Sequence, residues 1–73
     1  MLETSYDLFK GKLNGNPMWI GTSELLDEGV DKLAGVADGE PGEYFLYNGS
    51  TGLVVATLQK MAAGPTRIVR CWT

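Results

Sequence analysis

Hydrophobic residues recur at helical spacing in the middle of the chain. The intervals are four, three and four, so these residues fall on one stripe of an amphipathic helix. They are Leu26, Val30, Leu33 and Ala37. The pattern predicts a helix over residues 24–37, with Thr22 or Ser23 as its N-cap and Asp38-Gly39 as its end. Gly29, inside this helix, indicates a close approach between the helix and a sheet.

Two further patterns, one on each side of the helix, predict β-hairpins. Residues 6–10 and 18–21 are rich in strand-favouring types, and they flank Asn14-Gly15, which is a strong turn signal. Residues 43–48 and 53–58 flank the Gly-rich turn 49–52 in the same way. The chain is therefore expected to run as hairpin, helix, hairpin.

The C-terminal part of the chain has more than one interpretation. Residues 59–65 fit a loop or a short helical turn, and residues 67–72 are β-branched and aromatic, as in a strand. We expect one α+β domain over residues 1–73, in which residues 6–58 form an antiparallel four-stranded sheet with one helix on one face, in the order β-β-α-β-β. The extension 59–73 is expected to add a fifth strand or to be swapped within a dimer, and a mobile tail is the alternative.

Both faces of the second hairpin are apolar. Side chains alternate along a strand, so Tyr44 and Leu46 point to one face while Phe45 and Tyr47 point to the other. One helix covers one face, and strands that are apolar on both faces are usually covered on both. The second face is therefore expected to be covered by the C-terminal segment, by a second subunit or by a ligand.

This second face leads to a functional expectation. We expect a small non-enzymatic domain that binds other proteins or itself, as a homodimer formed through the second sheet face or the C-terminal segment. The candidate interaction residues are Trp19, Tyr44, Phe45, Tyr47, Val55 and Trp72. The alternative is a small-ligand or single-stranded nucleic-acid binding module that stacks bases on these aromatic rings.

The charge of the chain disfavours nucleic acid as the partner. The formal net charge is −3, whereas binding driven by phosphates needs clustered Lys and Arg. A basic patch would require Lys10, Lys12, Arg67 and Arg70 to converge in the fold.

Catalytic chemistry finds little support in the composition. The chain has no His and one Cys, Cys71, so Ser/His and Cys/His pairs and a structural zinc site are not expected. Acidic residues of the predicted helix lie opposite its apolar stripe, which is typical of a solvated face. We expect no catalytic, metal-binding or cofactor-binding residues, and no cofactor. The lone cysteine and the absence of a secretory pattern favour the cytoplasm, and the longest apolar run, 53–56, is too short for a membrane.

The order of these signals resembles that of small uncharacterised bacterial proteins with two hairpins around one helix. The similar segments are Tyr6-Asp7-Leu8-Phe9, the stretch from Asn14 to Gly21, the stretch from Pro41 to Tyr47, and the stretch from Thr51 to Ala56. The resemblance covers about residues 6–58. It implies a ββαββ fold and no known activity, so no functional residue follows from it.

Overall fold

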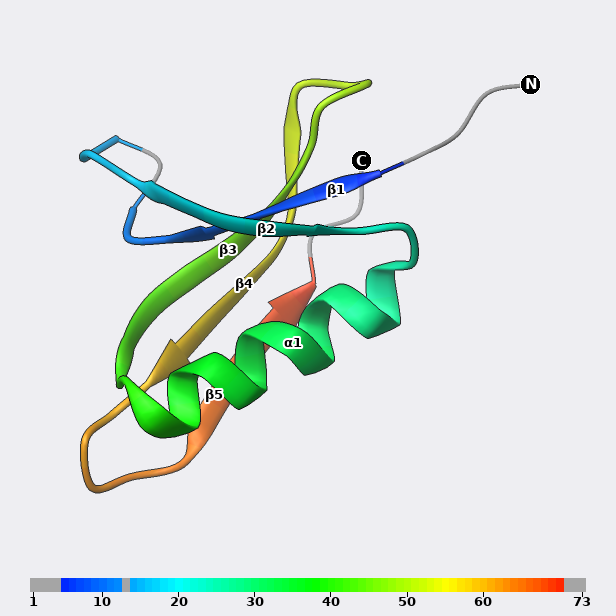
Figure 1. Ribbon diagram of the computed structural model, residues 1–73. Coiled ribbons are helices and arrows are strands. Elements are labelled where there is room, and N and C mark those ends of the chain that lie inside the picture. The colour runs from blue at the N-terminus through cyan, green and yellow to red at the C-terminus, as the bar shows by residue number, and fades with distance from the viewer. Residues whose placement is uncertain (1–4, 13, 71–73) are drawn as a thin grey trace.

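The computed structural model describes residues 5–12 and 14–70 and shows one helix on one side of an antiparallel sheet (Figure 1). The helix is α1 (Leu26–Gly39). The strands are β1 (Tyr6–Lys10), β2 (Met18–Ser23), β3 (Gly42–Asn48), β4 (Leu53–Lys60) and β5 (Thr66–Arg70). The expected α+β architecture is confirmed, and a fifth strand follows the second hairpin.

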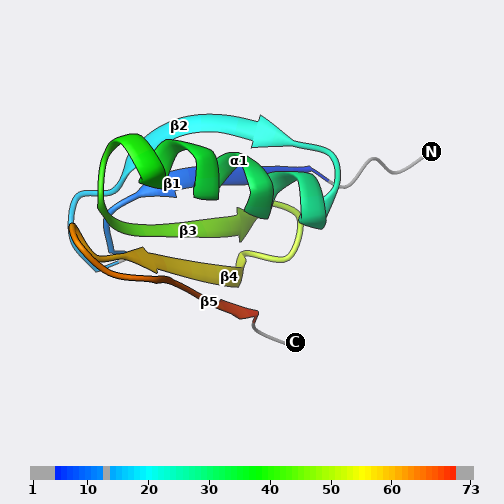
Figure 2. The same ribbon diagram turned by 90° about the horizontal axis from the view of Figure 1, so that it is seen from below.

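The sheet has the strand order β2-β1-β3-β4-β5 (Figure 2). The two hairpins are joined through β1 and β3, which pair antiparallel with Leu8 opposite Leu46. Strand β5 pairs with β4 at the sheet edge, with Ile68 opposite Leu58. Because β5 widens the sheet, residues 66–70 do not cover the second face.

The start of α1 differs from the expected one. Strand β2 continues through Ser23, and the helix begins two residues later than predicted, with Leu25 at its N-cap and no side-chain cap. The Ser23 hydroxyl instead donates a hydrogen bond to the Leu25 carbonyl, at 2.8 Å. The capping role predicted for Thr22 or Ser23 is therefore wrong, because both residues pair with β1 as part of strand β2.

The core lies between α1 and the sheet face beneath it. Its buried members are Leu8, Val30, Leu33, Ala37, Tyr44, Leu46, Ala56 and Leu58. Gly29 is buried where the helix comes nearest to β3, and a Cβ built there would lie 2.5 Å from Leu46 Cδ2. The expected close approach at Gly29 is confirmed, because a larger residue requires Leu46 to move.

Two β-bulges interrupt the alternation of side chains. On β4, Tyr47 pairs with Val54 and Leu46 with Ala56, so Val55 has no partner across the ladder. On β2, Ile20 is left over in the same way between Trp19 and Gly21. Both extra residues are partly buried against the core, as a bulge permits by turning a side chain from its regular direction.

Candidate interaction face

The sheet face turned away from α1 carries one row of side chains that crosses all five strands. The pairing register places its members side by side, from β2 to β5. They are Trp19, Phe9, Phe45, Thr57 and Val69. We call this side of the sheet the open face, since no helix or strand within residues 5–12 and 14–70 lies over it.

Aromatic rings fill the centre of the open face. The rings of Phe9 and Phe45 are stacked, with centroids 5.0 Å apart and planes inclined by 15°. Tyr47 meets Phe9 edge to face, at 6.3 Å. Phe45 is only 3% exposed, so its neighbours bury it without a covering helix. Aromatic pairs of this kind contribute about 0.5–1.5 kcal/mol beyond the area that they bury.

The β2 end of the row projects into solvent. Trp19 is 58% exposed, and its indole Nε1 donates a 3.3 Å hydrogen bond to Asp7 Oδ1. Since β2 is an edge strand, the indole has Phe9 on one side and no neighbouring strand on the other. Trp19 is therefore an exposed aromatic group at the rim of the open face, oriented by its hydrogen bond to Asp7.

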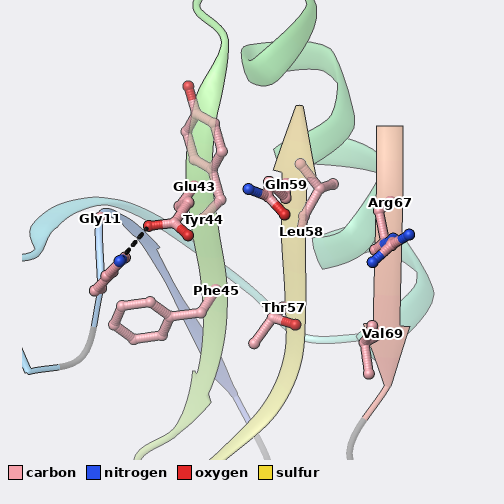
Figure 3. A pocket seen from close by; sticks show the side chains of 10 residues that line it. Gly11, Glu43, Tyr44, Phe45, Thr57, Leu58, Gln59, Arg67 and Val69 are labelled. Carbon is pink, nitrogen blue, oxygen red and sulfur yellow. Dashed lines mark ion pairs between the residues drawn. The ribbon is translucent and has the colours of Figure 1, made fainter. Parts of the chain in front are cut away.

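The β5 end of the face is hollowed. A depression of about 330 Å³ lies over β3, β4 and β5, beside the turn that follows β1 (Figure 3). Its wall combines the apolar side chains of Phe45 and Val69 with the polar groups of Thr57, Gln59 and Arg67. We call this depression the hollow.

An ion pair closes one side of the hollow. Lys12 Nζ lies 3.7 Å from Glu43 Oε2, and both groups remain partly exposed (Figure 3). Arg67 stands on the opposite side and forms no ion pair with any residue of the described segments. The hollow therefore offers an apolar floor, a neutralised carboxylate and one guanidinium available for a further contact.

The basic residues that a nucleic-acid site would need are divided between the two faces. Lys10 pairs with Glu40, and Arg70 Nη2 lies 3.0 Å from Asp27 Oδ1, both on the α1 side. The hydrogen bond with Glu40 raises the pKa of Lys10 against a smaller opposing effect of desolvation. The open face carries Lys12 and Arg67 together with the acidic Asp7 and Glu43, so these four groups leave it with no net positive charge.

The structure brings together three of the six residues predicted for the interaction surface. Trp19, Phe45 and Tyr47 share the open face. Tyr44 instead lies in the core at 2% exposure, with its hydroxyl donating to the Glu40 carbonyl. Val55 packs against the core at its bulge. Trp72 lies outside the described residues.

Phe9 and Val69 complete the open face, and the sequence-based selection omitted them. Alternation along residues 6–10 opposes Phe9 to the core residue Leu8, and this would have assigned it to the open face. Assigning Val69 required the pairing of β5 with β4, which no local pattern encodes.

Two features are absent from the described part of the chain: a cluster of metal-ligating side chains and a membrane-spanning helix. Within residues 5–12 and 14–70, no three His, Cys, Asp or Glu side chains gather closely enough to hold a metal ion. The helix of this part of the chain is too short and too polar to cross a membrane.

Comparison with known proteins finds no relative. No protein-family model, curated protein or solved structure matches the chain. The resemblance to small bacterial ββαββ proteins therefore stays a prediction from the sequence, and the functional argument rests on the open face itself.

Proposed function

We propose that this protein is a non-enzymatic, self-associating domain that pairs with a second copy of itself through the open face. The observation that carries the proposal is the row of side chains across five strands, aromatic in its centre, over which no described helix or strand lies. Exposed apolar groups mark an interaction surface, and Trp19 and Val69 at the two ends of this row are 58% and 50% exposed. Consistent with its lone cysteine, we place the domain in the cytoplasm.

A second copy is the partner that the domain favours on physical grounds. A chain of 73 residues has a thin core, with roughly 60% of its unfolded surface buried, and association adds to that burial. Closed twofold dimers are the commonest form of self-association. The open face also balances its own charges, because Asp7 and Glu43 are matched by Lys12 and Arg67. Two copies can therefore meet without a net repulsion.

The experiment is to measure the mass of the protein in solution over a wide concentration range. Light scattering after size exclusion should give about twice the chain mass of 7.9 kDa at high concentration and a decrease towards it on dilution. Thr57→Glu places a charge in the middle of the row and should shift the protein to the monomer. Thr51→Glu makes the same change in the exposed β3–β4 turn and should leave the dimer intact.

A monomer at every concentration up to the millimolar range contradicts the proposal. So does a dimer that Thr57→Glu and Thr51→Glu weaken equally, because the contact would then lie elsewhere or depend on net charge alone.

Single-stranded nucleic acid is the second candidate, favoured by the exposed ring of Trp19 and the partly buried ring of Tyr47 beside Phe9. The divided basic residues argue against it. Titration with a single-stranded oligonucleotide at low salt, followed by backbone amide shifts, tests it. Saturable shifts confined to β1, β2 and β3 that vanish with added salt would support this function over self-association.

A further inference from the structure

We infer that the Trp19 indole of each copy seats in the hollow of the other, so that the dimer is held by two equivalent Trp19-in-hollow contacts. This inference rests on the proposed self-association and states which residues carry it. The exposed Trp19 ring and the hollow lie on the same face of the same chain, near opposite edges of the sheet.

The strand order makes this arrangement compatible with a twofold axis. Trp19 on β2 and Val69 on β5 are the two ends of one row, and β3 is the middle strand of the five. An axis that runs along β3, between two facing sheets, places β2 of one copy over β5 of the other. The same operation applies to both copies, so a single geometry satisfies both indoles, as an isologous interface requires.

The hollow has the size and chemistry for an indole. Its volume of about 330 Å³ holds one such side chain, and Phe45 and Val69 supply apolar contacts. Arg67, on its wall, has no ion-pair partner among the described residues and can lie over the ring face. In cation–π contacts of proteins, tryptophan is the most favourable ring and arginine the more frequent cation.

The area of the face shows why such a contact is needed. Five strands at a spacing of roughly 4.8 Å, each about six residues long, give a plane of roughly 24 by 20 Å. Two flat faces of that size bury on the order of 1,000 Å², which is near the lower limit for a specific interface. Stable pairing therefore depends on a few deeply seated groups, and tryptophan and arginine are the residues most enriched among them.

Two variants remove the two sides of the contact separately. Trp19→Ala deletes the inserted group, and Thr57→Tyr fills the hollow with a ring from its own chain. Each should raise the dimer dissociation constant at least tenfold in sedimentation velocity. Met18→Ala is the matched control, because Met18 precedes Trp19 on the same edge strand, is equally exposed and pairs with Lys10 on the α1 side of the sheet.

Mixing the two variants tests whether the two sites contact each other. Each variant alone has lost both contacts, whereas a heterodimer restores one: Trp19 of the Thr57→Tyr chain enters the empty hollow of the Trp19→Ala chain. The equimolar mixture should therefore form more dimer than either variant at the same total concentration. Circular dichroism of each variant checks that it is folded.

Incorporated 5-fluorotryptophan gives a second readout. The fluorine resonance of Trp19, assigned by comparison with Trp72→Phe, should shift with protein concentration in the wild type. In the Thr57→Tyr variant that shift should be lost, since the hollow is occupied from within.

The outcomes separate this inference from the proposed function. A monomeric wild type overturns both. A dimer that Thr57→Glu disrupts but that Trp19→Ala and Met18→Ala affect equally overturns the inference and leaves the self-association in place. A dimer that tolerates Thr57→Tyr, or a mixture with no gain over its components, also overturns it, because the hollow then does not receive Trp19.

Discussion

The two faces of this sheet are built from the same strands and bury their side chains in different ways. Leu46 and Phe45 are neighbours on β3, and both are nearly inaccessible, at 0% and 3% exposure. Leu46 is covered by α1, whereas Phe45 is covered by rings and side chains of its own sheet. The centre of the open face is thus buried, whereas its two ends are exposed: Trp19 to 58% and Val69 to 50%.

This difference separates folding from association. The buried core lies between α1 and the sheet of one chain, so the helix side determines whether the domain folds. The open face has a buried centre and exposed ends, so substitutions at its ends should have little effect on the fold. Variants on the two faces should therefore differ in both size and kind of effect.

The largest effect is expected at the covered face. Leu46→Ala removes a fully buried side chain beneath α1, and such cavities cost about 2–5 kcal/mol. We expect a loss of about 3 kcal/mol in the free energy of unfolding, measured by urea denaturation and far-UV circular dichroism. That is much of the total stability of a domain of this size. A loss below about 1 kcal/mol would show that α1 does not seal this face.

Phe45→Ala, one position away, should cost less. Its ring is bordered by Phe9 and by solvent-accessible side chains that can move into the vacated space. We expect a loss of about 2 kcal/mol, below the usual range for a phenylalanine enclosed on all sides. The same denaturation at low protein concentration measures it in the monomer. If this loss equals or exceeds that of Leu46→Ala, the open face is as closed as the covered one and the comparison fails.

The approach of α1 to the covered face is tested by two glycines of the helix. Gly29→Ala adds a methyl group against Leu46 and should destabilise the domain by about 1–2 kcal/mol through overpacking. Gly35→Ala is the matched control, since outside the neighbouring helix backbone no atom lies within 4 Å of a Cβ built there. It should stabilise the domain by about 0.5–1 kcal/mol through helix propensity.

A third variant shows whether Leu46 causes the Gly29 effect. Valine lacks the Cδ2 atom that the new methyl would meet, so Gly29→Ala should cost less in a Leu46→Val background. Equal costs in both backgrounds would assign the effect to another neighbour.

Much of the covered face could be predicted from the sequence, because its signals are local. The stripe Leu26, Val30, Leu33 and Ala37 identified the helix, and Asn14-Gly15 together with the 49–52 turn identified the hairpins. The N-cap was mispredicted because threonine and serine, the residue types at positions 22 and 23, occur both in strands and at helix N-caps. Only the pairing with β1, a contact between distant elements, decides between these roles.

The open face was predicted less completely, for two physical reasons. Alternation alone separates Tyr44 from Phe45, so Tyr44 belonged with Leu46 in the core and its selection as a surface residue was inconsistent with the pattern. Val55 obeys no alternation, because the bulge that turns it to the core is a property of the pairing with β3. The row from Trp19 to Val69 depends on the order of the five strands in the sheet, and no local sequence pattern determines that order.

The smallest expected effect concerns the charges at the margin of the covered face. Among the described residues, Lys10–Glu40, Lys60–Asp38 and Arg70–Asp27 join the sheet to α1 or to the residue after it, whereas Lys12–Glu43 borders the open face. The hydrogen bond with Glu40 raises the pKa of Lys10. A raised pKa in the folded state means that this contact stabilises the domain fully below the ordinary lysine pKa of about 10.4 and loses its contribution as pH rises through the raised value.

Nuclear magnetic resonance titration of the lysine side chains measures this directly. In the wild type, Lys10 should titrate above its ordinary pKa, and Glu40→Gln should lower that pKa towards the ordinary value because the charged acceptor is removed. Glu43→Gln is the control: it removes the carboxylate at the open face and should leave the pKa of Lys10 unchanged, since its partner is Lys12. Equal responses of Lys10 to the two substitutions would mean that the margins of the two faces are not electrostatically separate, and the contrast between them would then hold for the apolar side chains alone.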